Sequence, residues 1–418
     1  MKQRLIEIGK NIVIVLLSCT LLLLSLFAIP TASIEKHPWL AGILQPVAPL
    51  LGLPEAELTQ VAQAEPVRDA ARPIAISVMD QGGRHTAMWD RSALDLTFER
   101  FAPHLGQALE LAGQFAYVSA EQVQAALSES SVYLRYAAPL PASLIASWLG
   151  ASLEASIGEV DICILSAAGD TVQLYLLGPN VSYCTDTGMD PEELRALMQT
   201  FSPDGSAFAF ETSYDLSPLS LLPGAAPAVP AITASDPCDS RYIDTLATAM
   251  GFNPYGESRY TDDRGNVRFS ETGASLEIAA GGTITYRGES RRFTADSDQP
   301  EALVETARQL TELIFAGVPG EGRLYLTAFS QEEETTVCRF NYVLAGIPLR
   351  LAEDAIRITF TENTVTEAVM QVWSFTGSGK TVYPLPVPQA AAMLPDGGAL
   401  EMGYCINTDL TLSAGWIG

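Results

Sequence analysis

Residues 336–375, TVCRFNYVLAGIPLRLAEDAIRITFTENTVTEAVMQVWSF, decide the fold class of this chain. Apolar and polar residues alternate along them, so that Ile356, Ile358 and Phe360 share one side of a strand and Arg357 lies on the other. An alternation of this kind is typical of antiparallel strands that have one buried and one solvated face. We therefore predict an antiparallel meander over these residues.

Helical patterns lie on the N-terminal side of this meander. Residues 239–250 (DSRYIDTLATAM) have helical spacing and are followed by Gly251, which favours the end of a helix. A longer helix is expected over residues 299–318, with Asp298 as its N-cap. Helices beside antiparallel strands define the α+β class, which we predict for residues 238–418.

An earlier α+β unit is predicted over residues 73–216. Residues 93–112 (ALDLTFERFAPHLGQALELA) have helical spacing, and Pro103 is expected to kink or split this helix. The rest of the unit is dominated by short apolar runs with strand character. These runs lie at 73–79, 132–137, 160–167, 171–178 and 181–186.

Two shorter helices in this unit begin at recognisable caps. Ser119 is followed three residues later by Gln122, which completes a capping box. Asp190 precedes Pro191, and proline is favoured at the first helical position. We predict a helix start at each of these caps.

Two further segments are rich in proline and alanine and have no sustained period. Residues 30–72 are predicted to form a juxtamembrane stalk. Residues 217–237 (SPLSLLPGAAPAVPAITASDP) are predicted to form a semi-extended linker that is rarely part of a core. This linker would separate the unit at 73–216 from the C-terminal region at 238–418.

The N-terminal segment carries a membrane signal. Residues 12–29 read IVIVLLSCTLLLLSLFAI, contain no charge, and approach the ~20 residues needed to span a bilayer. Basic residues precede this run, so residues 1–10 are expected in the cytosol by the positive-inside rule. We predict a single-pass anchor at 11–29 in the cell membrane, followed by an extracytoplasmic domain. The alternative is a cleaved signal peptide, which usually has a shorter apolar region and a clearer cleavage site.

Three small polar residues recur every seven positions along this predicted helix: Asn11, Ser18 and Ser25. Seven residues make about two helical turns, so the three share one face. Small polar residues on one face allow another helix to approach closely and to hydrogen-bond. We predict that this face contacts a partner helix; the alternative is that serine is simply common in membrane helices.

The net charge of −25 limits the partners of the chain. Residues 1–10 carry Lys2, Arg4 and Lys10 against Glu7 alone, a net charge of +2, so the rest of the chain is more acidic still. A surface of this sign repels phosphate backbones, which excludes nucleic acid as an expected partner. The hydrophobic content of 48% is enough to build folded cores.

One segment has part of a nucleotide-binding motif. Residues 376–381 (TGSGKT) are similar to the end of a phosphate-binding loop, but Ser374 stands where the full pattern needs glycine. The motif also needs a helix after Lys380, and VYPLPVP cannot form one. We therefore expect a glycine-rich hairpin turn here and no cofactor.

The remaining reactive residues do not form a recognisable site. His37, His85 and His104 lie apart, with no Cys, Asp or Glu at ligand spacing. The chain contains neither GxSxG nor HExxH. We therefore predict no catalytic residue and no bound metal.

Five cysteines follow the predicted anchor: Cys163, Cys184, Cys238, Cys338 and Cys405. Their odd number and wide spacing argue against a dense disulfide framework. Cys338 alternates with aromatic residues and is expected in the core. Cys163 and Cys184 lie on neighbouring strand-like runs that would allow a bridge, so the sequence leaves the disulfide state open.

Four stretches together suggest a family. They are KNIVIVLLSCTLLLL (10–24), MGFNPYGESRYTDDRGNVRFSETGASLEIAAGGTITYRG (250–288), FNYVLAGIPLRLAEDAIRITFTENTVTEAVMQVWSF (340–375) and LPVPQAAAML (385–394). Their order resembles the YycH/YycI family, membrane-anchored regulators of the WalK (YycG) sensor histidine kinase in Gram-positive bacteria. The resemblance covers the anchor and most of 238–418. It implies a non-enzymatic regulator, whose partners are the membrane helix of the kinase and a paralogous regulator.

Two other functions stay open. An extracytoplasmic binding module for a peptide or cell-wall fragment would need a deep pocket with convergent polar groups, expected around residues 217–237. An envelope enzyme would need carboxylates, or a Ser/Lys or Cys/His pair, that only the fold brings together.

Overall fold

The computed structural model describes residues 70–417, except 156, 257, 289–291, 321 and 333. From Ala70 onward the chain forms one compact unit. The predicted cytosolic start, the anchor at 11–29 and the stalk up to residue 69 lie outside the described residues. Within the part that is described, no helix is both long enough and apolar enough to cross a bilayer.

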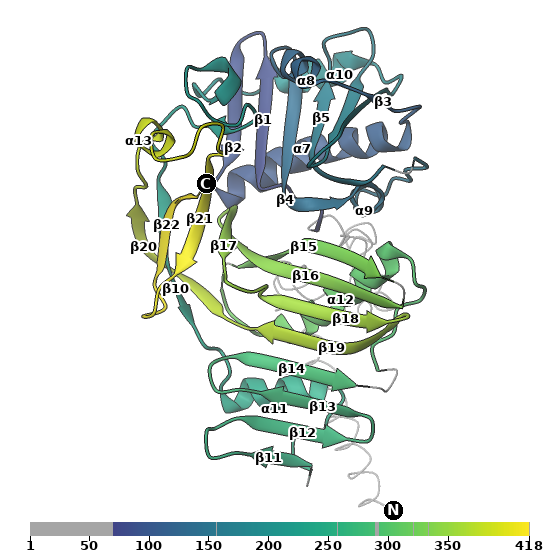
Figure 1. Cartoon of the computed structure of the whole chain (residues 1–418), viewed down its shortest axis with the longest axis vertical. Coiled ribbons are helices and arrows are strands. Elements are labelled where there is room, and N and C mark those ends of the chain that lie inside the picture. Colours follow the sequence, from purple (N-terminus) through teal and green to yellow (C-terminus); the bar gives the residue numbers. More distant parts are fainter. Residues whose placement is uncertain are drawn as a thin grey trace, which may run out of the picture. The chain divides into compact units, whose positions relative to one another are not determined.

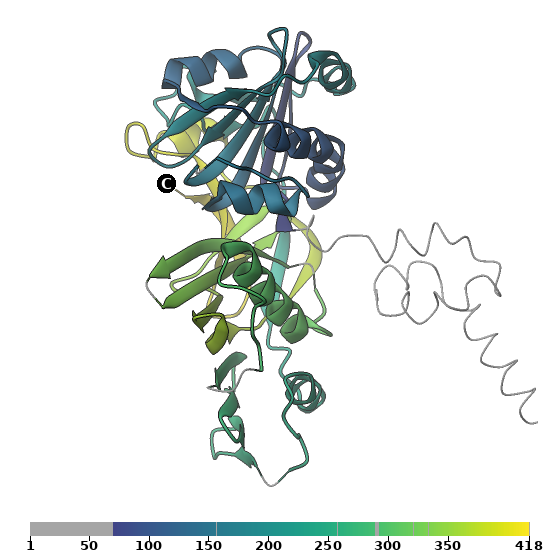
Figure 2. The ribbon, with the colours of Figure 1, turned by 90° about the vertical axis from the view of Figure 1, so that its right-hand side faces the viewer.

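The predicted α+β class is confirmed, with seven helices and large antiparallel sheets in the described residues (Figures 1 and 2). The first sheet has seven strands, all antiparallel to their neighbours, in the order β2-β1-β4-β5-β6-β7-β3. Its elements are β1 (Ala75–Asp80), β2 (Gly83–Met88), α7 (Arg91–Glu110), β3 (Ala116–Tyr117), α8 (Ala120–Leu127), β4 (Ser131–Pro141), α9 (Ala142–Trp148), β5 (Glu159–Ser166), β6 (Gln173–Leu177), β7 (Ser182–Asp186) and α10 (Pro191–Met198).

Helix α7 runs without a break through Pro103, so the prediction that this residue could split the helix is wrong. A proline inside a helix removes one hydrogen bond and disfavours the helix by about 3 kcal/mol. Pro103 lies on the exposed side of α7, whereas Phe98, Phe101 and Leu105 on the other side are buried. Packing of that apolar face outweighs the local penalty.

Both predicted helix caps are present in this first sheet unit. The Ser119 hydroxyl accepts the backbone N–H of Gln122, and the Gln122 side chain accepts that of Ser119. The Asp190 carboxylate accepts the N–H of Glu192 at the start of α10. Each cap satisfies backbone donors that the first helical turn leaves open, so each helix begins at its predicted residue.

The segment predicted as a linker, 217–237, contributes two strands. They are β9 (Leu221–Leu222), which pairs with β8 (Ala207–Phe208), and β10 (Val229–Ser235). Seven residues of the segment are buried: Ser220, Leu221, Leu222, Pro227, Val229, Ile232 and Ala234. The expectation that this segment stays out of the core is wrong for these residues, because β9 pairs with β8 and β10 pairs with a distant strand, β20 (Ser374–Val382).

The C-terminal region contains two successive units, each a helix followed by an antiparallel meander. The first unit comprises α11 (Ser240–Ala249), β11 (Arg259–Thr261), β12 (Val267–Glu271), β13 (Ala274–Ile278) and β14 (Thr283–Gly288). The second comprises α12 (Pro300–Phe315), β15 (Arg323–Glu332), β16 (Thr335–Leu344), β18 (Ile356–Thr361) and β19 (Thr364–Gln371), with the short β17 (Ile347–Arg350) inserted.

The two meanders form one eleven-stranded sheet because β14 pairs with β19. Strand β21 (Glu401–Ile406) pairs with β17 and extends the sheet to β22 (Leu412–Ile417). Figures 1 and 2 show α11 and α12 on the same face of the sheet. Ile356, Ile358 and Phe360 are fully buried and Arg357 is exposed, which confirms the predicted alternation.

One helix cap was predicted at the wrong residue. Helix α12 begins at Pro300 with Gln299 as its N-cap, and the Asp298 side chain does not cap it. Proline is favoured at the first helical position because its fixed φ already suits the helix, and α12 therefore starts at Pro300. The predicted helix itself is present, and Leu303, Ala307 and Leu310 are buried on one of its faces.

The five described cysteines are all free. Cys163 pairs with Leu176 in the sheet, whereas Cys184 pairs with Tyr175, the next residue along β6. Successive residues of a strand point to opposite faces, so these two thiols lie on opposite sides of the sheet. The bridge that the sequence left open is therefore excluded.

This arrangement predicts the order of thiol reactivity. An alkylating reagent at mildly alkaline pH should modify the exposed Cys405 first and leave Cys163 and Cys338 unmodified in the folded chain. Burial raises the pKa of Cys338 to about 12 and that of Cys163 well above its ordinary value, so neither forms much thiolate. Peptide mass spectrometry measures the extents, with the urea-unfolded chain as the control in which all thiols react. Equal rates at Cys163 and Cys405 would contradict the burial.

Candidate functional site

A cavity of about 800 Å³ lies at the N-terminal end of α7. Its walls come from the first residues of α7, residues 223–230, the turn between β16 and β17, and β20 (Ser374–Val382). Ligand pockets in proteins usually enclose about 300–1,000 Å³, so this cavity has the size of a small-ligand site.

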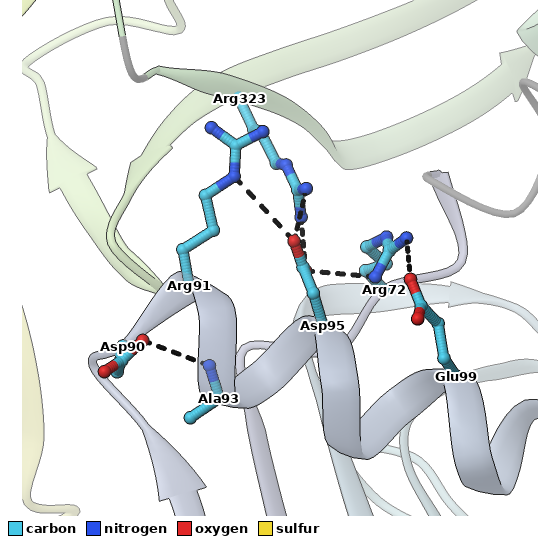
Figure 3. Close-up of polar contacts among 7 residues, drawn as sticks. All are labelled: Arg72, Asp90, Arg91, Ala93, Asp95, Glu99 and Arg323. Atoms are coloured by element: carbon cyan, nitrogen blue, oxygen red, sulfur yellow. Dashed lines mark hydrogen bonds and ion pairs between the residues drawn. The ribbon is translucent and has the colours of Figure 1, made fainter. Parts of the chain in front are cut away.

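The start of α7 is held in a strained conformation at this cavity. Trp89 has φ of +58°, an uncommon value for a bulky residue, and its ring meets Trp416 edge-on at 5.4 Å. Asp90 follows as the N-cap, and its carboxylate accepts the N–H of Ala93 at 3.0 Å (Figure 3). Strain of this kind persists only where surrounding contacts impose it, and it is frequent at ligand sites.

The turn between β16 and β17 packs against the start of α7, at Trp89 and Leu94. Ala345 and Gly346 have φ of +53° and +80°, as the central residues of a tight hairpin turn require. A Cβ atom at Gly346 would overlap the side chain of Leu94 and touch the backbone of Trp89. Glycine is therefore needed here, and the close approach fixes the eleven-stranded sheet to the first turn of α7.

Strand β20 places Lys380 at the cavity. Residues 376–381, expected as a hairpin turn, instead lie in β20, which pairs with β10, so that prediction is wrong. The register shifts by two residues between Pro230 and Ile232, and Gly379 has φ of +72° in the resulting bulge. Lys380 is the only lysine of the described residues, and its exposed side chain has neither hydrogen bond nor ion pair with any of them.

Four charged residues thus line one cavity: Asp90, Arg91, Asp204 and Lys380. The Asp204 carboxylate accepts the backbone N–H groups of Thr86 at 2.8 Å and Ser206 at 2.9 Å. Residues 223–228 rest on the same loop, because a Cβ atom at Gly224 would overlap the Asp204 carbonyl oxygen. Two cationic and two anionic groups therefore converge on the cavity from three separate segments.

An ion-pair cluster surrounds Asp95, which lies further along α7 than the N-cap Asp90 (Figure 3). Both carboxylate oxygens of Asp95 accept a hydrogen bond of 2.6 Å from Arg323 on β15. Arg72 approaches the same carboxylate at 3.1 Å and also donates to Glu99 at 3.2 Å. Arg91 lies 3.9 Å from Asp95 while it also lines the cavity. Asp95 thus joins the start of the described chain, α7 and the eleven-stranded sheet.

The described residues contain no cluster of three His, Cys, Asp or Glu side chains that could hold a metal. His85 lies 4.0 Å from Asp204, and His104 lies 4.0 Å from Glu193 on another part of the surface. The predicted partner-helix residues Asn11, Ser18 and Ser25 lie outside the described residues. Sequence reasoning missed Asp95 entirely, because its partner Arg323 is 228 residues away.

Comparisons of the chain with protein-family models, with curated proteins and with solved structures gave no match.

Proposed function

We propose that this chain is a non-enzymatic, membrane-anchored extracytoplasmic regulator of a two-component sensor histidine kinase. In this proposal it acts through the predicted transmembrane helix at 11–29 and through contacts of its ectodomain. Its partners are the membrane helix of the kinase and a paralogous regulator, and nucleic acid is not a partner. The resemblance of residues 238–418 to the YycH/YycI family supports the proposal.

The single observation that carries the proposal is the position of Asp95. This carboxylate binds Arg72, close to where the chain leaves the predicted stalk, and also Arg323 on the eleven-stranded sheet. A change in the relation of α7 to that sheet therefore alters the contacts of Arg72, the last residue of the predicted stalk. A regulator needs such a connection, because it must convert an ectodomain event into a shift at the membrane.

The mechanism needs no chemistry. A helix that packs better against one kinase conformation than against another shifts the population by its differential affinity. In membranes, contacts between small polar groups contribute about 0.6–2 kcal/mol each, enough to bias a switch modestly. Asn11, Ser18 and Ser25 would supply these contacts in the present chain.

Photocrosslinking inside the membrane tests this proposal. A photoreactive side chain at Ser18 or Ser25 is expected to crosslink a sensor kinase through its own membrane helix, which mass spectrometry identifies. The same probe at Leu16 or Leu23, on the opposite face of the helix, is the matched control and should crosslink mainly lipid. Crosslinks only to lipid at all four positions would refute the helix-partner mechanism.

A second candidate function is an extracytoplasmic binding module for a peptide or cell-wall ligand. The observation that favours it is the cavity of about 800 Å³, which residues 223–230 of the predicted linker help to line. Its four charged residues are the convergent polar groups that such a site needs. Both functions can belong to one protein if the ligand alters the contacts of α7.

A further inference from the structure

We infer that the cavity at the start of α7 binds a short zwitterionic peptide. Lys380 and Arg91 receive its carboxylate, and Asp90 and Asp204 receive its ammonium group. This inference deepens the second function above, ligand binding by the ectodomain, and rests on it.

The charges of the cavity select this class of ligand. The chain has a net charge of −25, yet the walls of the cavity carry equal numbers of cationic and anionic side chains. A polyanion would meet Asp90 and Asp204 as well as the net negative charge of the chain, which disfavours it. A neutral sugar would leave the Lys380 ammonium without a counter-charge. A peptide with free termini matches both signs, and charge-assisted hydrogen bonds are the strong ones.

The backbone along one wall suits a peptide. Ala225, Ala226 and Ala228 are exposed, and their N–H groups form no hydrogen bond with any described residue. Pro223 and Pro227 limit the conformations of this wall by fixing φ, and the chain bends at Gly224 and Ala225. Open N–H groups along such a wall can donate to the carbonyl groups of a peptide laid beside it.

The size and shape of the cavity limit the ligand to a few residues. The small side chains of residues 224–228 leave the space open, and the partly exposed Met88 provides apolar surface for an alkyl side chain. The strained Trp89 and the bulge at Gly379 hold the two charged walls in place before a ligand arrives. A site that is ordered in advance loses less entropy on binding.

Competitive acetylation of the full chain in detergent tests the inference. The ratio of acetylation at Lys380 to that at Lys36 is measured by peptide mass spectrometry, so that reagent consumed by the ligand cancels. A tripeptide library with free termini is expected to lower this ratio. The same library with an acetylated N-terminus and an amidated C-terminus is the matched control and should leave the ratio unchanged.

Equilibrium dialysis of the free-terminus library against variants then tests which charged residues bind the ligand. Lys380→Met should weaken binding roughly tenfold or more, whereas Lys380→Arg keeps the charge and should retain most of the affinity. Asp90→Asn should also weaken binding, although asparagine caps a helix as well as aspartate. Asp263→Asn, in the turn between β11 and β12, is the control and should have no effect.

The other outcomes overturn the inference in distinct ways. Equal protection of Lys380 by the capped library would show that the termini are not recognised. Protection by an N-acetylglucosamine tetrasaccharide alone would make the ligand a glycan and leave ligand binding intact as a function. No protection by any of these ligands would refute both the peptide inference and the binding module. The regulator proposal does not depend on this result, because the membrane crosslinks at Ser18 and Ser25 test it separately.

Discussion

Replacing Glu211 with alanine is expected to lower the free energy of unfolding by about 3–5 kcal/mol. Its carboxylate accepts a hydrogen bond of 2.8 Å from Arg84, whose side chain is only 3% exposed. The same guanidinium lies 4.4 Å from the ring centroid of Phe208 and donates to the carbonyl of Leu127 at 2.9 Å. Removal of Glu211 would leave a buried positive charge without its counter-charge.

The Glu211 carboxylate also accepts the backbone N–H of Phe208 at 2.7 Å, so the variant loses a second hydrogen bond. Urea denaturation followed by circular dichroism measures the change. Glu192→Ala is the matched control, because Glu192 pairs with Arg195 at 3.2 Å on the surface, where such pairs contribute about 0–1 kcal/mol. A loss at Glu211 no larger than at Glu192 would contradict the role of the buried pair.

Signals that act within a few residues were predictable from the sequence. The Ser119 capping box and the Asp190 cap each involve groups within three positions, and both define the helix starts in the structure. The alternation of Ile356, Ile358 and Phe360 required only a period of two. These features do not depend on where the rest of the chain lies, so local sequence is sufficient to predict them.

Features made by distant pairing were not predictable. Strand β2 (GRHTAM) lacks apolar alternation and is a strand because it pairs with β1. Residues 229–235 read as a linker because proline and alanine dominate, yet pairing with β20 makes them a strand. The Arg84–Glu211 pair spans 127 residues, so no window of sequence contains both partners.

The candidate site combines both kinds of information. The TGSGKT segment is similar in sequence to the end of a phosphate-binding loop. It does not form such a loop, because these residues lie within strand β20. The glycines matter instead for the bulge that brings Lys380 to the cavity. Residues 217–237 were the expected place for a pocket, and part of them does line one. The opposite wall, Trp89 to Ser92, gave no sequence signal of a site.

Asp95→Ala is expected to destabilise the chain by roughly 2–4 kcal/mol. Asp95 is the shared carboxylate of Arg72, Arg91 and Arg323, which lie together on one side of α7 (Figure 3). Its removal leaves three guanidinium groups facing one another, with Glu99 still bound to Arg72. The effect is below that expected for Glu211→Ala, because the Arg72 and Arg323 side chains are 12% and 18% exposed, against 3% for Arg84, and water partly screens their charges.

The matched control is Asp244→Ala on α11, where the carboxylate pairs with Arg259 alone at 2.7 Å. That variant should cost about 1 kcal/mol, since it removes one partly exposed ion pair. A double-mutant cycle of Asp95→Ala with Arg323→Ala should give a coupling energy of about 0.5–3 kcal/mol, as expected for residues in direct contact. Additive effects would mean that the bidentate pair does not connect α7 to the eleven-stranded sheet. The path from the ectodomain to the predicted stalk would then have to run through other contacts of α7, and Asp95 could not carry the proposed regulation.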